Sequence, residues 1–116
     1  MKVNELKPYQ KKISLLVKIA STGEVREVVA RLDNSLHKVA EALAGDETAS
    51  IMLTLWDGEI DRAEKGKTYG IENAYTTVFR NSIRLNVGKY GKMEESGQQI
   101  GEVNVENNLS EKELGP

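Results

Sequence analysis

Three aromatic side chains, Trp56, Tyr75 and Phe79, stand out in this 116-residue sequence because their type and positions suit stacking on a flat ligand. They make up half of the aromatic rings, because the chain has one Trp, one Phe and four Tyr. Aromatic faces stack on unpaired nucleic-acid bases of any kind, at about 1–3 kcal/mol per base. Arg80 and Arg84 follow Phe79 closely and carry charge that can hold phosphate groups. The cluster predicts a surface for unpaired bases.

The apolar alternation of residues 51–56 predicts a strand with Trp56 on its outer face. Every second residue is aliphatic, so this set faces a core and the intervening residues face outward. Residues 82–87 repeat the pattern. The outward residues with polar or aromatic side chains are then Thr54, Trp56, Ser82, Arg84 and Asn86.

Residues 68–79 need a change of parity before Tyr75 and Phe79 can face outward. The core-type residues of this segment fall on odd positions in its first half and on even positions in its second half. A β-bulge near Glu72 or Asn73 would produce that change. The competing interpretation makes the three rings simply the large residues of a small core.

Charge is distributed unevenly along the chain. Residues 94–116 hold six Glu against one Lys, a net charge of −5, within a total of −2. The preceding residues therefore carry a net charge of +3, and an acidic tail on a basic body recurs among nucleic-acid-binding proteins. Further candidate phosphate contacts, at looser spacing than Arg80 and Arg84, are Lys12, Lys18, Arg26 and Lys38.

The composition excludes several classes of function. The chain has no Cys, which excludes thiolate catalysis and Cys-ligated zinc, and its single histidine, His37, excludes a site with several His ligands. No nucleophile with a base partner and no Gly-rich phosphate loop is recognisable. We therefore expect no catalytic residue, no metal and no cofactor. No run approaches the roughly 18 apolar residues of a membrane span, so we expect a cytoplasmic protein.

The order of patterns predicts an all-β fold. One long strand bends at Gly23, and strands at residues 37–43 and 51–56 complete a meander. A short helix within residues 57–67 precedes two more strands, which is the order of the five-stranded OB-fold barrel. An SH3-like barrel is the alternative, but it normally lacks this helix.

The two ends of the chain carry weaker patterns. Residues 1–10 read as a leader with Leu6 and Tyr9 packed against the body. Residues 94–116 have almost no hydrophobic periodicity, so we expect an OB-fold domain over residues 1–93 and a flexible acidic tail over residues 94–116.

The sequence resembles the simple archaeal single-stranded DNA-binding proteins and their eukaryotic relatives in damage-sensing complexes. The stretches that carry the resemblance are residues 4–8 (NELKP), 45–48 (GDET), 53–56 (LTLW) and 71–79 (IENAYTTVF). The resemblance implies one OB-fold with a flexible acidic tail, and its base-stacking aromatics fall on Trp56, Tyr75 and Phe79. The middle position is commonly Trp in crenarchaeal members, and the tail of this chain is rich in Glu and Asn rather than in Gly or Pro.

The residues and the resemblance together predict sequence-tolerant binding and protection of single-stranded DNA in replication, recombination or repair. We expect a monomer that is associated with the nucleoid, with a tail that recruits replication or repair proteins or covers the basic groove. Two alternatives stay open: single-stranded RNA binding, since stacking distinguishes the sugars poorly, and an OB-fold interaction subunit of a larger complex.

Overall fold

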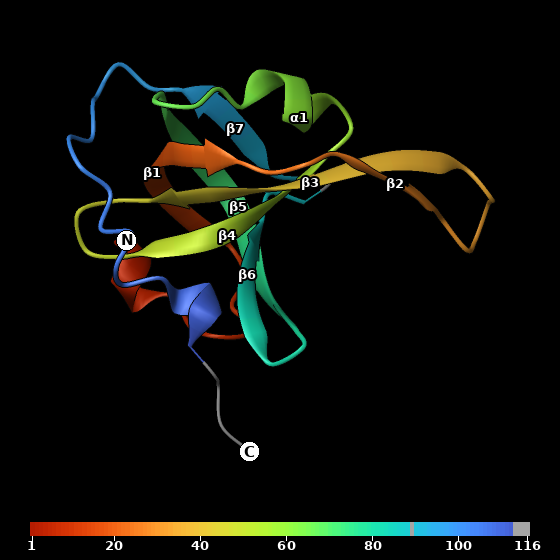
Figure 1. The fold of residues 1–116 in the computed structure, drawn as a ribbon, viewed down its shortest axis with the longest axis horizontal. Coiled ribbons are helices and arrows are strands. Elements are labelled where there is room, and N and C mark those ends of the chain that lie inside the picture. Colours follow the sequence, from red (N-terminus) through yellow and green to blue (C-terminus); the bar gives the residue numbers. More distant parts are fainter. Residues whose placement is uncertain (89, 113–116) are drawn as a thin grey trace.

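The computed structural model describes residues 1–88 and 90–112, and its regular secondary structure consists mainly of β-strands (Figure 1). One short α-helix, α1, interrupts the strands, and short 3₁₀ helices lie near both ends of the described chain. The elements in chain order are η1 (Val3–Glu5), β1 (Ile13–Thr22), β2 (Arg26–Val29), β3 (Leu36–Gly45), β4 (Ser50–Trp56), α1 (Gly58–Arg62), β5 (Thr68–Phe79), β6 (Ser82–Asn86), β7 (Lys92–Glu95) and η2 (Leu109–Glu111).

Five of the strands close into a ring. Neighbours in the sheet follow the order β1, β3, β4, β6 and β5, and β5 pairs back with β1. The β4–β6 pair is parallel and the other pairs of the ring are antiparallel. This order of strands, with α1 between β4 and β5, is the predicted OB-fold. The predicted helix is shorter than its window of residues 57–67.

The predicted bend at Gly23 divides the first strand into β1 and β2, which both pair with β3. Thr22 pairs with Ala42 and Arg26 with Val39, so the β1–β2 side has one residue more than β3 between these pairs. The Gly23 N–H donates to the Glu41 carbonyl at 2.8 Å, and a Cβ at Gly23 would lie just as close to that oxygen. A side chain does not fit there, which explains the glycine at the bend.

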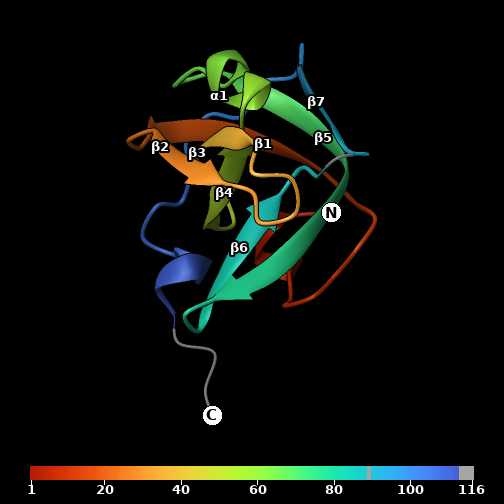
Figure 2. The same ribbon diagram turned by 90° about the vertical axis from the view of Figure 1, so that its right-hand side faces the viewer.

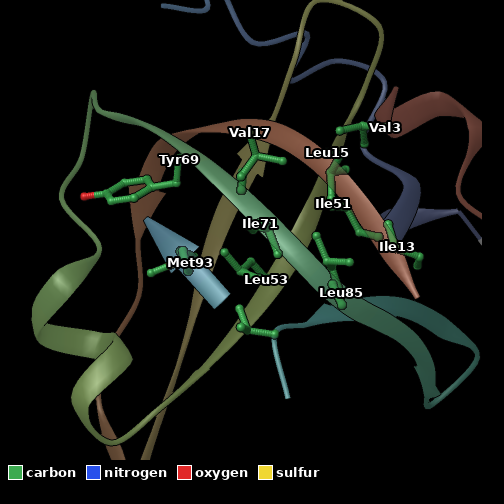
Figure 3. Packing of buried hydrophobic residues seen from close by; sticks show 14 of the residues in the cluster. Val3, Ile13, Leu15, Val17, Ile51, Leu53, Tyr69, Ile71, Leu85 and Met93 are labelled. Carbon is green, nitrogen blue, oxygen red and sulfur yellow. The ribbon is translucent and has the colours of Figure 1, made fainter. Parts of the chain in front are cut away.

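The core fills the inside of the ring (Figure 3). The aliphatic residues predicted to face inward from residues 51–56 and 82–87 are buried there. Tyr69 is also buried, and its hydroxyl donates to the Arg62 carbonyl at 2.7 Å and accepts from the Glu64 N–H at 2.8 Å. Its polar end is thereby satisfied, as a buried Tyr requires.

The structure does not show the flexible tail that we predicted, because residues 94–112 pack on the body. β7 pairs with β5, and Asn108 forms a parallel bridge with Ser50. The Ser110 hydroxyl accepts from the Met52 N–H and donates to the Ile83 carbonyl, so it fills the gap between β4 and β6. Backbone groups and the Ser110 hydroxyl make these contacts, and hydrophobic periodicity does not reveal them. Residues 113–116 lie outside the described residues, and the domain boundary at residue 93 stays a prediction.

The leader is fixed to the body by a buried carboxylate. Asp46 accepts hydrogen bonds from the Val3 N–H at 2.9 Å, the Thr48 N–H at 2.9 Å and the Thr48 hydroxyl. Burial alone would raise the pKa of Asp46, but these bonds outweigh it and the pKa is lowered. Leu6 is buried as predicted, whereas Tyr9 is exposed, so its expected packing was wrong.

Candidate nucleic-acid interface

A β-bulge in β5 turns Tyr75 and Phe79 to the outside. Leu15 pairs with Ile71 and Ile13 with Ala74, so β5 has one residue more than β1 between these pairs. Asn73 lies in this extra stretch with a φ of 55°, a left-handed conformation that Asn tolerates better than most residues. The predicted change of parity is confirmed: the side chains of Tyr75 and Phe79 are 37% and 55% exposed.

Trp56 ends β4 and is also on the outside, with 40% of its surface exposed. The next residue, Asp57, has a φ of 49°, and its carboxylate accepts from the Lys38 N–H at 2.9 Å and bonds His37 Nδ1 at 2.8 Å. The Lys38 bond and then the His37 bond lower the pKa of Asp57. The Trp56 N–H donates to Glu59 Oε1 at 3.0 Å. The backbone that carries this ring is therefore tied to β3 and α1.

The strand register places the three rings around a common outer face over β4, β6 and β5. Paired residues of neighbouring strands point to the same side of a sheet. Tyr75 pairs with Asn86 and Asn86 with Thr54, while Phe79 pairs with Ser82 two residues before Arg84. We name this surface the aromatic face, with these members: Thr54, Trp56, Tyr75, Thr77, Phe79, Ser82, Arg84 and Asn86.

Phe79 lies between two guanidinium groups. The Cζ atoms of Arg80 and Arg84 are 5.2 Å and 5.8 Å from the centroid of its ring, within the range of cation–π contacts. Arg80 and Asn81 make the tight turn between β5 and β6, both with positive φ. This end of the aromatic face combines a ring with positive charge.

Arg84 is held in place by an ion pair with Glu41 of β3. The side chains of Arg84 and Glu41 are only 19% and 29% exposed, and Arg84 Nε also donates to the Ser82 hydroxyl at 3.2 Å. Burial lowers the pKa of Arg84, and the nearby charge of Arg26 lowers it further. A carboxylate thus lies at the centre of a surface whose other charges are positive.

Tyr75 packs over Gly88, where β6 has just ended. A Cβ on Gly88 would approach Tyr75 Cε1 to 2.6 Å, and the φ of Gly88 is 80°. Glycine is required here both for the close approach and for the backbone conformation. Because Gly88 has no side chain, the ring of Tyr75 can approach the backbone there, and Tyr75 remains 37% exposed.

The looser basic residues divide into two groups. Arg26 pairs with Val39, which pairs with Trp56, so Arg26 is on the side of the aromatic face. Lys12 lies beside β5 near Tyr75, because Ile13 pairs with Ala74 and the Gln10 carbonyl accepts from the Thr76 N–H.

Lys38 and Lys18 are not brought to the aromatic face. Lys38 has the opposite parity from Glu41 in β3 and so points to the other side of the strand. Lys18 pairs with Gly45, at the far end of β3 from the Val39–Trp56 pair, and its Nζ donates to the Gly101 carbonyl at 2.7 Å.

Sequence reasoning missed Glu41 and the exposure of the hairpin of β2 and β3. The hairpin projects from the body (Figure 1) and exposes apolar side chains at its tip. The unbroken aliphatic spacing of its residues resembled that of a core strand, so the pattern gave no signal of exposure. The exposed apolar residues are Val25, Val29, Leu32 and Leu36.

Residues 1–88 and 90–112 contain neither a candidate membrane span nor a candidate metal site. No helix there is long and apolar enough to cross a membrane. No group of three or more His, Cys, Asp or Glu side chains within this part of the chain is placed to hold a metal ion.

The ring of strands, with α1 between β4 and β5, defines an OB-fold. Residues 6–95 match the family described as "Single-stranded DNA binding protein Ssb-like, OB fold". The chain belongs to this family, as its resemblance to the archaeal proteins predicted.

Individual relatives agree with this membership. The single-stranded DNA binding protein Ssb of Saccharolobus solfataricus is 33% identical over 97 residues, which span 84% of this chain and 64% of that protein. The solution structure of a hypothetical protein from Arabidopsis thaliana is 32% identical, with a TM-score of 0.78 over 100% of this chain and 87% of that one. The second OB-fold domain of replication protein A from Methanococcus maripaludis shares the fold, with a TM-score of 0.68 over 87% of this chain and 98% of that one, at 18% identity.

Proposed function

We propose that this protein binds single-stranded DNA without strong sequence preference, by stacking bases on Trp56, Tyr75 and Phe79. The observation that carries the proposal is the aromatic face, where three large rings are exposed on β4 and β5, the two strands that flank β6. Exposing three rings costs stability unless a ligand covers them. Rings spread over one face of the sheet suit a ligand that presents a series of flat surfaces, and unpaired bases do so.

The charges around the rings support a polyanionic ligand. Arg80, Arg84 and Arg26 lie on the same side as the rings, and cationic side chains hold phosphates in a salt-dependent way. Thr54 is a half-buried polar residue between the rings and is proposed to contact base edges or sugars. Asn86 is buried and donates to the Thr77 hydroxyl at 3.0 Å, so its proposed role is to support this surface from below. Lys12 extends the positive charge beside Tyr75. Lys18 and Lys38 contribute only to the overall field.

A fluorescence titration tests the proposal directly, because Trp56 is the only Trp of the chain. Its emission should fall when oligo-dT is added at low salt and should recover as salt is raised. Absence of quenching at low salt would refute the proposed stacking. Comparing oligo-dT with oligo-U of the same length decides whether RNA is bound equally well.

A variant of Phe79 supplies the second test and keeps Trp56 as the reporter. Phe79→Ala should weaken binding by about 1–3 kcal/mol, the usual contribution of a stacked ring. The domain should stay folded because more than half of this side chain is exposed. Val25→Ala, which removes an exposed apolar side chain outside the aromatic face, should leave the affinity closer to that of the parent protein.

A second candidate function, protein docking, is favoured by the exposed hairpin. Val29, Leu32 and Leu36 expose apolar side chains at or near its tip, where they are available to a partner, and such patches often mark interaction sites. If this were the main function, Trp56 emission would not respond to oligonucleotides. The titration therefore separates an OB-fold interaction subunit from a nucleic-acid-binding protein.

The cellular role that we propose is to coat and protect exposed strands during replication, recombination or repair. It needs no catalysis, and we propose a monomer associated with the nucleoid. Glu102, Glu106 and Glu111 remain exposed although their segment packs on the body, so they are proposed contacts for replication or repair proteins. Sedimentation of the free protein, and of its mixture with oligo-dT, tests the oligomeric state.

A further inference from the structure

Residues 7–12 overlap the end of the leader, residues 1–10, and we name them the leader segment. They are the most basic stretch that borders the aromatic face. Three of its six residues are lysines, Lys7, Lys11 and Lys12, and none is acidic. All three lysines are exposed. Among the residues that the structure describes, no carboxylate pairs with them. Their charge is therefore available to an anion.

The leader segment is held rigidly by a single residue of β5, Thr76. The Thr76 hydroxyl donates to the Lys7 carbonyl at 2.6 Å and accepts from the Gln10 N–H at 2.9 Å. The Thr76 N–H donates to the Gln10 carbonyl at 2.9 Å, and the Gln10 side chain accepts from the Lys7 N–H at 2.7 Å. Lys7 and Gln10, the two ends of the turn formed by residues 7–10, are thus fixed in the absence of a ligand.

This turn displays Tyr9 to solvent. Tyr9 is 72% exposed and has a φ of 59°, which is unusual for a bulky residue. None of the hydrogen bonds that fix the turn uses its ring. A large apolar ring on a rigid turn loses little conformational freedom when it stacks on a ligand.

The turn lies next to one of the rings of the aromatic face. Thr76 follows Tyr75 directly, and residues 10–13 run beside residues 74–76 of β5. Figure 2 shows the start of the chain passing alongside β5. The leader segment lies beside residues 74–76 of β5, so a DNA strand that continues past Tyr75 toward this side of β5 comes to the leader segment.

We propose that the leader segment extends the nucleic-acid site beyond Tyr75, with Tyr9 stacking an additional base and with Lys7 and Lys11 contacting phosphates. The inference rests on the proposed function and adds a position that only a longer single strand reaches. Short strands fill the aromatic face alone, and longer strands also cover the leader segment.

The test compares two oligonucleotide lengths, about 5 and about 15 nucleotides, near the ends of the range of site sizes known for OB-folds. Tyr9→Asn removes the ring and keeps a residue that tolerates the left-handed backbone. It should weaken binding of the longer oligo-dT about five- to tenfold, as measured by Trp56 quenching, and leave the shorter one unchanged. Tyr9→Phe keeps the ring and should bind both lengths as the parent protein does.

The outcomes separate this inference from the proposed function. If the parent protein quenches on neither oligonucleotide, the proposed function fails. If the parent protein binds and Tyr9→Asn weakens both lengths equally, or neither, the proposed extension is wrong while the aromatic face stands. A thermal melt of Tyr9→Asn within a degree or two of the parent midpoint shows that the change is local.

The lysines give an independent measurement. Each phosphate contact on a single strand contributes about 0.7 to the slope of log affinity against log salt. Lys7→Gln with Lys11→Gln should reduce the slope by about 1.4 for the longer oligo-dT and leave it unchanged for the shorter. Lys38→Gln with Lys65→Gln removes the same charge from outside the leader segment and the aromatic face, so it is the matched control. Equal slopes for both double variants at both lengths would overturn the inference.

Discussion

The ion pair of Arg84 and Glu41 predicts a variant whose stability and affinity change in opposite directions. Glu41→Gln keeps the shape of the side chain and an oxygen that accepts from Arg84, but it removes the negative charge from the aromatic face. The folded protein loses an attractive pair. A bound phosphate, in contrast, loses a repulsive neighbour.

The two magnitudes follow from the burial and the spacing of the charges. The pair is 19% and 29% exposed, between the surface pairs that contribute up to about 1 kcal/mol and the buried pairs that cost about 3–5 kcal/mol to break. Because Gln still accepts a hydrogen bond, we expect a loss of about 1 kcal/mol in the free energy of unfolding. A phosphate about 6 Å from the Glu41 carboxylate is repelled by about 0.7 kcal/mol in water, so Glu41→Gln should bind about threefold more tightly at low salt.

The assay measures urea unfolding and oligo-dT binding on the same preparations. Glu27→Gln is the matched control: Glu27 pairs with Lys38, so it points away from the aromatic face while carrying the same charge. It should change neither quantity by more than a few tenths of a kcal/mol. If Glu41→Gln bound more weakly than the parent protein, Glu41 would be orienting Arg84 for the ligand, and the repulsion argument would be refuted.

Three other predictions concern the scaffold. Asn73→Gly should keep the stability within a few tenths of a kcal/mol, whereas Asn73→Val should lower it by about 1–2 kcal/mol in a urea titration, because only the second residue resists a positive φ. Ser110→Ala leaves two backbone groups between β4 and β6 without their partner and should cost about 1–3 kcal/mol by the same measurement. The pKa of Asp46 is lower in the folded than in the unfolded chain, so its stabilisation is present above about pH 4 and is lost as pH falls through the folded-state value. Asp46→Asn should therefore melt earlier at pH 7 and lose less stability below pH 4, as followed by circular dichroism.

The outward position of the rings could be predicted because alternation in a strand is a local property. Two residues of one strand differ in facing according to their separation alone, so Trp56 follows from its neighbours. The bulge was predictable for the same reason, since core-type residues change parity within β5. The bulge is confirmed by the extra residue between Ile71 and Ala74 and by the left-handed Asn73.

The features that the sequence concealed depend on contacts between distant residues. Arg84 and Glu41 lie on strands that meet only through β4, and no spacing rule joins them. Ser110 is polar and isolated in the sequence, yet it completes the sheet. Tyr9 was expected to pack inside because aromatic residues usually do. The hydrogen bonds of Thr76 fix its turn without its ring, so the ring remains outside.

The hydrogen bonds that Ser110 makes to β4 and β6 have a consequence for folding during synthesis. The match to the family ends at residue 95, but the parallel strands β4 and β6 gain their last hydrogen bonds from a residue fifteen positions later. During synthesis from the N-terminus, the ring of strands can assemble before Ser110 is available to bond β4 and β6. The hydrogen bonds of Ser110 can form only after the chain has been synthesised as far as η2. A fragment trimmed to the family limits, residues 6–95, would lack Ser110. The Met52 N–H and the Ile83 carbonyl would then be left without this hydrogen-bond partner.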